Sequence, residues 1–423
     1  MHKEKMKVFL ISIVIAIWTN GCAVNGLKEP ERINQSETLA KPYVILVSID
    51  GYRYDYTSKY SPPVISQFMS AGTSTKELLP VYPSKTFTNH YSIVTGLFAE
   101  NHGIVANSFY DPLRKEEYNL SNSENVRDGT WYNGTPIWVA AEQQGMLAAN
   151  YFWPGSEAAI QGVRPSYFIP YDEKKSLVER INQVKKWLDL SPNQRPHFIT
   201  LYFSEVDSAG HKYGPQSNEV KEAVFKVDRA IGHLVEQMKT VPLPVNIIIV
   251  SDHGMQEINP NNVEYLDDYT DIKRVRFLGG GPQASLYLND SRNMAKVYGD
   301  LKAKAKHFQV YKRDEIPERF HYSKSARCGD LIIVAESPYL ISLRNKSPEK
   351  GLGNHGFDPD TTQSMHGIFY ALGPQIKKRT ILAPFRNVHI YPLIMRILGL
   401  KILTPIDGNS AVLEPVYVNG SNL

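Results

Sequence analysis

The stretch from Tyr43 to Asp50 reads YVILVSID, and it decides the fold class. It is apolar, rich in β-branched residues, and ends in a carboxylate. Two later stretches have the same character: residues 197–207 (HFITLYFSEVD) and residues 245–253 (VNIIIVSDH). Short apolar runs of this kind are typical of strands buried on both faces, as in a parallel sheet covered by helices. The ends of such strands are where open α/β sheets bind ligands.

Helical patterns separate these predicted strands. The clearest runs from Ser217 to Lys239, where apolar residues recur every three or four positions along one face. A second amphipathic helix is predicted from Ser176 to Leu188. The alternation of strands and helices predicts a doubly wound α/β fold with a largely parallel central sheet flanked by helices. We expect one catalytic domain over residues 42–415, with loop or lid insertions near 108–135 and 256–350.

Residues 1–22 have the pattern of an export signal. Basic residues precede the apolar run from Val8 to Trp18, which is too short to cross a bilayer that needs about 20 apolar residues. Gly21 favours a lipoprotein signal in which Cys22 is lipidated and anchors the chain to a membrane, although Thr19 is unusual for such a signal. Residues 23–41 are polar and predict a solvated tether. We therefore expect an exported protein, periplasmic or on the cell surface if bacterial and otherwise secreted.

The composition is that of an ordinary globular protein, with 42% hydrophobic and 21% charged residues. The net charge of +4 falls by two when the lysines and the glutamate of the export signal are removed. A nearly neutral chain gives no electrostatic reason to expect a nucleic-acid polymer as partner. Cys22 and Cys328 are the only cysteines, so lipidation of Cys22 leaves Cys328 as a buried or inert thiol and no internal disulfide. We expect a monomer.

Carboxylates and imidazoles that suit a metal ion follow the predicted strands, except for His366, which lies just ahead of another apolar run. They are Asp50, Asp207, His211, Asp252, His253 and His366. Asp207 and His211 are four residues apart, so both face one point if the chain turns helically there. Each residue alone is also explained as a surface or loop residue, but a charged pair ending a buried strand is costly unless it is solvated or bound. As a set they suit zinc, with manganese or iron possible, and they are enough for two ions.

A hydroxyl residue begins a predicted short helix. Residues 83–96 read PSKTFTNHYSIVTG, in which Pro83 ends an extended stretch and Gly96 closes the helix. Thr86 then lies at the helix N-terminus, where backbone N–H groups and the helix dipole favour an anion such as a phosphoryl group. Spacing alone leaves two interpretations open, a catalytic hydroxyl and a helix cap.

Taken together, the segments VSIDGYR, YPSKTFTNHYSIVTG, EVDSAGHKYGP, VSDHGM and MHGIF resemble the nucleotide pyrophosphatase/phosphodiesterase family of the alkaline phosphatase superfamily. The resemblance runs in order from about Tyr43 to beyond Phe369. It implies an alkaline-phosphatase-like fold and a two-zinc hydrolase that cleaves phosphodiester or pyrophosphate bonds of small nucleotides, releasing nucleoside 5′-monophosphates. It also implies that Thr86 attacks phosphorus and forms a phosphothreonine intermediate, which water then cleaves.

The resemblance further implies a role for each site residue. One zinc ion would be bound by Asp50, Thr86, Asp252 and His253, and the other by Asp207, His211 and His366. Asn107 would bind a nonbridging phosphate oxygen, and a neutral amide suits a diester. The substrate-binding residues would be Phe87, Trp153, Tyr171 and Tyr202. Of these, Phe87 and Tyr171 would stack on the nucleobase and Trp153 would form the pocket wall.

Three alternatives stay open. The same metal core would serve a hydrolase of phospholipid head groups or phosphonates, and Ser204 stands where several nucleotide-cleaving relatives have an acidic residue. A phosphomonoesterase would need extra positive charge for a third phosphate oxygen, and the motifs offer no clear arginine for it. A catalytically inactive, ligand-binding lipoprotein is disfavoured because the set of ligands and Thr86 is complete.

Overall fold

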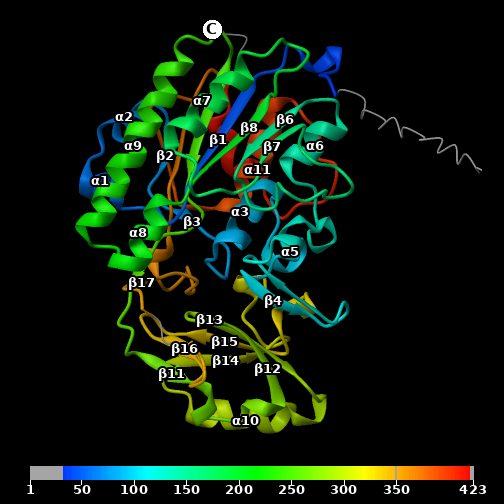
Figure 1. The fold of residues 1–423 in the computed structure, drawn as a ribbon, viewed down its shortest axis with the longest axis vertical. Helices are drawn as coiled ribbons and strands as arrows, with labels where there is room; N and C mark the ends of the chain where they lie inside the picture. The colour runs from blue at the N-terminus through cyan, green and yellow to red at the C-terminus, as the bar shows by residue number, and fades with distance from the viewer. Residues whose placement is uncertain (1–31, 348–349, 420–423) are drawn as a thin grey trace, which may run out of the picture. The chain divides into compact units, whose positions relative to one another are not determined.

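An eight-stranded mixed sheet forms the centre of the protein (Figure 1). The computed structural model describes residues 32–347 and 350–419. The strands follow the order β19-β2-β18-β9-β1-β8-β6-β7. Their bounds are β1 (Tyr43–Ile49), β2 (Thr73–Thr75), β6 (Ala148–Tyr151), β7 (Tyr167–Ile169), β8 (Phe198–Phe203), β9 (Val245–Val250), β18 (Phe369–Leu372) and β19 (Thr380–Leu382). Only β18 runs antiparallel to its neighbours, so the predicted largely parallel α/β sheet is confirmed.

β1 lies between β8 and β9 and pairs with both in parallel. Residues that follow these strands therefore emerge at one edge of the sheet. β8 ends at Phe203, and the predicted strand to Asp207 is wrong because helix α8 (Glu205–Tyr213) begins two residues later. The helical turn brings Asp207 and His211 to one face, as their spacing predicted.

Alternate side chains of β1 enter two different cores. Val44 and Leu46 belong to the core on one face of the sheet, whereas Ile45 and Val47 belong to the core on the other face. The first face is covered by α3 (Thr86–Thr95), α6 (Ile137–Gln143) and α11 (Ile390–Leu398), and the second by α2 (Pro63–Ala71), α7 (Leu177–Leu188) and α9 (Asn218–Met238). All four side chains are 0% exposed, and burying each contributes about 1.5–3 kcal/mol. This arrangement is the predicted doubly wound fold.

The two helices predicted from periodicity are both present. α9 begins after Ser217, whose side chain accepts from the backbone N–H of Val220. α7 begins with a capping box, in which Ser176 accepts from the N–H of Glu179 and the Glu179 carboxylate accepts from the N–H of Ser176. Each such cap contributes about 1 kcal/mol and fixes where its helix starts.

A smaller antiparallel sheet lies within residues 256–350, in the lower part of Figure 1. Its order is β12-β13-β15-β14. The elements of this region are β10 (Gln256–Glu257), β11 (Val263–Tyr265), β12 (Val275–Gly280), β13 (Gln283–Leu288), α10 (Met294–Lys304), β14 (Phe308–Lys312), β15 (Leu331–Ala335), β16 (Leu340–Ser342) and, just beyond it, β17 (Gly353–Asn354). Val297 and Leu301 of α10 join a hydrophobic core that is separate from the two cores of the main sheet.

A hairpin of β4 (Ser108–Asp111) and β5 (Glu116–Asn119) contacts the smaller sheet. The N–H of Tyr110 donates to the Tyr287 hydroxyl at 3.1 Å. The Arg276 guanidinium lies 4.0 Å from the centre of the Tyr110 ring and 3.0 Å from Glu117 Oε1. The two ranges that we expected to be insertions therefore contact each other. The remaining short elements are α1 (Tyr56–Tyr60), β3 (Leu78–Leu79), α4 (Ala99–His102), α5 (Ser123–Arg127), β20 (Phe385–Arg386) and α12 (Ser410–Leu413).

The polar segment before β1 is packed against the body from Asn34 onward. Asn34 is 2% exposed, and its Nδ2 group donates to the carbonyls of Pro192 and Arg195. Its Oδ1 accepts from the N–H of Leu147, which precedes β6. The expected solvated tether up to residue 41 is wrong for this part, because an asparagine with three backbone partners is well satisfied when buried.

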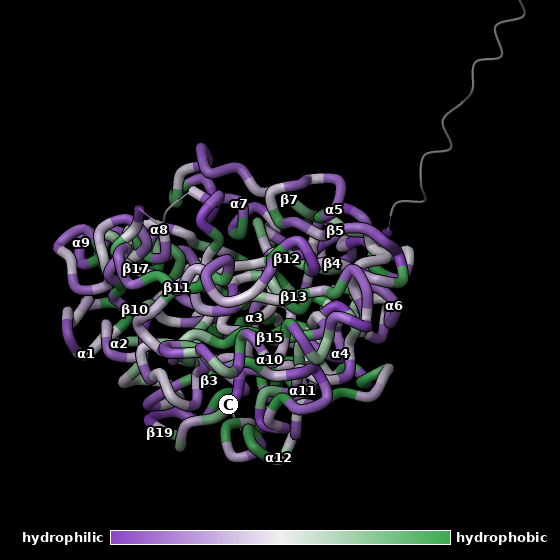
Figure 2. The backbone as a smooth tube through the Cα atoms, turned by 90° about the horizontal axis from the view of Figure 1, so that it is seen from below, coloured by the Kyte–Doolittle hydropathy of each residue, from purple (hydrophilic) through white to green (hydrophobic). Residues whose placement is uncertain are grey.

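Hydrophilic residues predominate on the outer turns of the chain, and hydrophobic stretches lie inside (Figure 2). In the described ranges, no helix combines the length and the apolar character needed to span a membrane. Cys328 is fully buried, and burial raises the pKa of its thiol well above the usual value, in agreement with the expectation of an inert group. The predicted export signal and Cys22 lie outside the described residues.

Candidate active site

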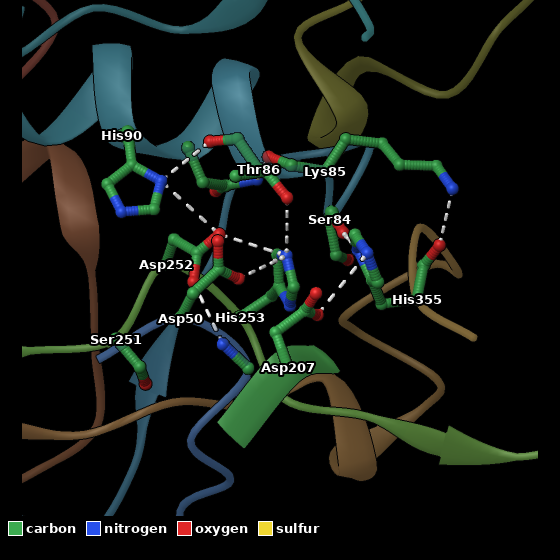
Figure 3. A network of polar contacts seen from close by, with 12 residues as sticks. Asp50, Ser84, Lys85, Thr86, His90, Asp207, Ser251, Asp252, His253 and His355 are labelled. Carbon is green, nitrogen blue, oxygen red and sulfur yellow. Dashed lines mark hydrogen bonds and ion pairs between the residues drawn. The ribbon is translucent and has the colours of Figure 1, made fainter. Parts of the chain in front are cut away.

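Asp50, Asp252 and His253 meet where β1 and β9 end (Figure 3). Their potential ligand atoms lie within 4.8 Å of one another. His253 Nε2 is 2.9 Å from Asp252 Oδ2 and 3.5 Å from Asp50 Oδ1. All three residues are at most 1% exposed. We call them the first ligand group, and their proximity follows from the parallel pairing of β1 and β9.

The electrostatics of the first ligand group favour an added cation. Burial, followed by the charges of Asp252 and Asp207, raises the pKa of Asp50 well above its usual value. Burial also acts to raise the pKa of Asp252, but His253 and His90 outweigh it and hold that pKa well below its usual value. Among the described residues, Asp50 Oδ1 has no hydrogen-bond donor. A buried carboxylate oxygen without a partner is costly, and a divalent cation would compensate it.

A second ligand group adjoins the first and consists of Asp207, His211 and His355. His211 Nε2 is 3.5 Å and His355 Nε2 is 3.8 Å from Asp207 Oδ1. The His355 ring stacks on that of His253, with 3.6 Å between ring centres. Within residues 32–347 and 350–419, no donor reaches Asp207 Oδ1. A second buried oxygen is thus directed toward a position that suits a cation.

Backbone carbonyls orient both imidazoles of the second ligand group. His211 Nδ1 lies 3.0 Å from the carbonyl oxygen of Gly353, and His355 Nδ1 lies 2.8 Å from that of Ser84. Each contact fixes the ring so that Nε2 is directed at Asp207. Metal-binding histidines are commonly held in this way through the nitrogen that does not bind the ion.

His366 does not join this group, in contrast to the prediction. Its Nδ1 is 2.6 Å from Glu77 Oε2, and its Nε2 is 2.7 Å from the carbonyl oxygen of Pro359. Both ring nitrogens are therefore occupied by acceptors of the protein itself. His355, which we did not predict, lies beside Asp207 instead. Its only local sign is that it precedes a glycine, Gly356, which has a φ of +117°.

Thr86 is the first residue of α3, and its side chain faces the ligand groups (Figure 3). Its Oγ1 is 3.3 Å from His253 Nε2. Lys85 occupies the N-cap position, and within the described residues neither its side chain nor that of Thr86 makes a capping hydrogen bond. The cap interpretation of Thr86 therefore does not hold. Gly96 ends the helix with a φ of 68°, as its position in the sequence predicted.

His90 and Asn107 hold the first turn of α3 in place. The His90 Nδ1 lies 2.8 Å from the Thr86 carbonyl and 3.4 Å from Asp252 Oδ2. This histidine had no predicted role, and it ties the helix to the first ligand group. The Asn107 Oδ1 accepts from the N–H of Phe87 at 3.1 Å. Its Nδ2 group is then the donor that Asn107 offers to a ligand at Thr86.

A cavity of about 410 Å³ adjoins Asp50 and Thr86, and we call it the aromatic cavity. Its lining includes every predicted substrate-binding residue: Phe87, Trp153, Tyr171 and Tyr202. Tyr171 is 50% exposed, whereas Trp153 and Tyr202 are only 1% and 7% exposed. The Tyr202 hydroxyl donates to Asp50 Oδ2 at 2.6 Å. Tyr171 is thus an accessible ring, whereas Trp153 and Tyr202 form the wall and Tyr202 also supports a ligand residue.

Residues 44–358 match the model of the family described as Type I phosphodiesterase / nucleotide pyrophosphatase. The chain belongs to this family. Among the relatives of this type I phosphodiesterase, bis(5′-adenosyl)-triphosphatase enpp4 of Mus musculus is 40% identical over 381 residues, which cover 89% of this chain and 81% of that protein. A venom phosphodiesterase of Naja atra is 37% identical over 393 residues, 90% of this chain and 46% of that protein. The chain spans less than half the length of several such relatives.

Solved structures of the family share the fold. Murine ectonucleotide pyrophosphatase / phosphodiesterase 5, in an inactive threonine-to-alanine form in complex with AMP, superposes with a TM-score of 0.84 at 32% identity. That comparison covers 89% of this chain and 100% of the murine chain. The human counterpart also has a TM-score of 0.84, at 31% identity. The alkaline-phosphatase-like fold and the family resemblance inferred from the sequence are thereby confirmed.

Proposed function

We propose that this type I phosphodiesterase hydrolyses phosphodiester or pyrophosphate bonds of nucleotides and releases nucleoside 5′-monophosphates. The observation that carries the proposal is the position of Thr86 Oγ1, 3.3 Å from His253 Nε2 at the edge of the aromatic cavity. The bis(5′-adenosyl)-triphosphatase and the AMP complex among its relatives support a nucleotide as the substrate.

We propose two bound Zn²⁺ ions, with manganese or another divalent metal as a substitute. One would be held by Asp50, Thr86, Asp252 and His253, and the other by Asp207, His211 and His355. The donor-free oxygens Asp50 Oδ1 and Asp207 Oδ1 fit this assignment, as does the mixture of carboxylates and imidazoles. When bound, zinc favours the deprotonated form of a hydroxyl group and offsets negative charge on a phosphoryl group.

The protein's own residues bind and orient the substrate before the first bond forms. Phe87 and Tyr171 hold the nucleobase in the aromatic cavity, and the Asn107 Nδ2 group donates to a nonbridging phosphoryl oxygen. Thr86 Oγ1 loses its proton to solvent and attacks phosphorus, the bond to the leaving group breaks, and a phosphothreonine that still carries the nucleoside forms. Water then cleaves the bond between phosphorus and Thr86 Oγ1, which releases the nucleoside monophosphate and restores the hydroxyl. His90 keeps the first turn of α3 beside Asp252 throughout.

We also propose that the protein is an exported monomer, anchored by a lipid on Cys22, with a single catalytic domain. The sequence pattern of residues 1–22 supports export and lipidation, and the grouping of Ile33–Leu423 in one compact unit supports a single domain.

The test compares Thr86→Ala with Thr88→Val on thymidine 5′-p-nitrophenyl phosphate. Thr88 lies on the same helix and is 0% exposed, and its Oγ1 has no hydrogen-bond partner in the part of the chain that the structure describes. Thr88→Val is therefore the matched control, because it also removes one hydroxyl group from α3. We expect Thr86→Ala to lose nearly all turnover and Thr88→Val to retain most of it. Equal losses in the two variants would contradict the assignment of Thr86.

The substrate class is tested with zinc-loaded wild type on nucleoside triphosphates, dinucleoside polyphosphates, choline phosphodiesters and phosphonates. Bis-p-nitrophenyl phosphate is expected to be cleaved much faster than the mono-ester, because a neutral Asn107 suits a diester. Strong activity on choline esters with none on nucleotides would reject the proposed substrate.

A further inference from the structure

A second cavity, of about 450 Å³, reaches the same site from another side. From the main body it is lined by Lys85, Asn107, His211 and His355, and from the smaller sheet by residues that include Gly279–Gly281, Ser342 and Lys346. It shares no lining residue with the aromatic cavity. However, Lys85 is next to Thr86 in sequence, and His211 lies one helical turn after Asp207. The two cavities therefore approach the nucleophile and the ligand groups from different directions.

The two cavities differ in charge. The aromatic cavity is lined by rings and carries three carboxylates, Asp50, Glu157 and Asp207, against one guanidinium, Arg127, which pairs with Glu157 at 3.1 Å. The second cavity carries Lys85 and Lys346, and no described residue in its lining is acidic. Lys85 is held in place because its Nζ donates to the carbonyl oxygen of His355 at 2.6 Å. The second cavity thus presents positive charge next to the second ligand group, and it suits an anion.

Backbone without side chains forms one wall of the second cavity. Gly279, Gly280 and Gly281 have φ values of 83°, 119° and 70°, a region that favours glycine. A Cβ atom on Gly281 would lie 3.2 Å from Asn354 Nδ2, so a side chain there would crowd the neighbouring loop. Reciprocal hydrogen bonds between the backbones of Gly281 and Ile341, at 2.8 Å and 2.7 Å, fix this turn. This wall therefore presents backbone groups, and no side chains from these three residues, to the cavity.

Displacement at phosphorus sends the leaving group away from the attacking oxygen. In an in-line reaction the nucleophile and the leaving group lie on opposite sides of phosphorus. A nucleoside stacked in the aromatic cavity brings its phosphoryl group to Thr86. The second cavity, beside His211 and His355, is then the space available to the leaving group. An anionic departing group would meet Lys85 and Lys346 there.

We propose that the second cavity binds the leaving group and favours leaving groups that carry phosphate. Lys346, supplied by the segment that follows β16, would be the specificity-determining residue. This inference rests on the proposed function, because it assumes that Thr86 attacks a nucleotide held in the aromatic cavity. It gives the region of the smaller sheet a role in choosing among nucleotide substrates.

The experiment compares two substrates with the same nucleoside and different leaving groups. Thymidine 5′-triphosphate releases pyrophosphate, and thymidine 5′-p-nitrophenyl phosphate releases nitrophenolate. Lys346→Glu is expected to lower kcat/KM for the triphosphate about tenfold, since an exposed charge is reversed near the substrate, and to change that for the nitrophenyl ester less than threefold. Lys346→Arg, which keeps the positive charge, should retain the wild-type preference for the triphosphate over the nitrophenyl ester. Lys306→Glu is the matched control, because Lys306 is also exposed and does not line the cavity.

The outcomes separate the two proposals. An equal loss on both substrates, or no change on either, would overturn the role of Lys346 while leaving the proposed function intact. A selective loss that Lys306→Glu reproduces would show a general charge effect, and it would also overturn the inference. Wild type that is zinc-loaded yet inert on both substrates would reject the proposed function, and the inference with it.

Discussion

Replacing Tyr202 by phenylalanine removes one hydrogen bond from the first ligand group and leaves the ring in place. The hydroxyl donates to Asp50 Oδ2 at 2.6 Å, and burial together with the Asp50 charge raises the pKa of Tyr202 well above its usual value. The hydroxyl therefore keeps its proton and stays a donor. A hydrogen bond to a charged group contributes about 1.5–3 kcal/mol. Because about 1.4 kcal/mol is tenfold in binding, we expect Tyr202→Phe to lower zinc affinity about 10–100-fold.

The assay is a zinc titration in metal-buffered solution, read both as recovered hydrolysis and as zinc bound per chain. Tyr171→Phe is the matched control, because it removes the same atom from the same cavity. Its hydroxyl is 3.4 Å from Ser204 Oγ, and the side chain is 50% exposed. We expect the control to titrate like wild type. Zinc binding by Tyr202→Phe that equals wild type would refute the reasoning that this hydroxyl supports Asp50.

Two further predictions concern histidines. His355→Ala should lose bound zinc and lower hydrolysis by about 100-fold or more, as expected for a lost metal ligand. His366→Ala should retain its bound zinc and its hydrolysis, and should lose about 1.5–3 kcal/mol of stability because its contact with Glu77 is removed. Metal analysis and chemical denaturation distinguish the two variants, and the reverse pattern would reinstate the original assignment of His366. Burial lowers the pKa of His102 to about 3, so its contribution to stability is complete above its unfolded pKa of about 6.5 and is lost as pH falls below that value. Between these two values, His102 changes the free energy of unfolding by about 1.4 kcal/mol per pH unit. The free energy of unfolding, measured at pH 7, 6 and 5, should therefore depend less on pH for His102→Gln than for wild type. Identical slopes in the two proteins would contradict this account.

Helices and strands with a regular hydrophobic pattern were predictable because the spacing of their apolar residues shows which positions are buried. The alternating cores of β1 and the one-sided stripes of α7 and α9 follow from local sequence alone. The same holds for Asp50 and Asp252, since each is the first charged residue after a buried run that ends at the edge of the sheet. Asp207 was placed correctly relative to His211 although the strand before it is shorter than predicted.

The choice between His355 and His366 could not be made from local sequence. His355 follows a strand of two residues, and its orientation depends on Ser84, which is 271 positions away, through one backbone contact. The Lys85 contact with the His355 carbonyl spans 270 positions. His366 lies beside a clear apolar run, as the other predicted ligands do, but its ring faces Glu77. The burial of Asn34 depends likewise on distant carbonyls, whereas its polar neighbourhood alone indicates solvent.

The attachment of Asn34 to the body determines which way an anchored enzyme would face. Asn34 contacts Leu147 and Arg195, which precede the strands β6 and β8, whereas Asp50 follows the opposite end of the parallel strand β1. Asn34 is therefore fixed at the end of the sheet opposite Thr86. Molecules diffusing in the surrounding fluid would meet the open side of the enzyme first, without having to enter the gap between the protein and whatever surface holds it.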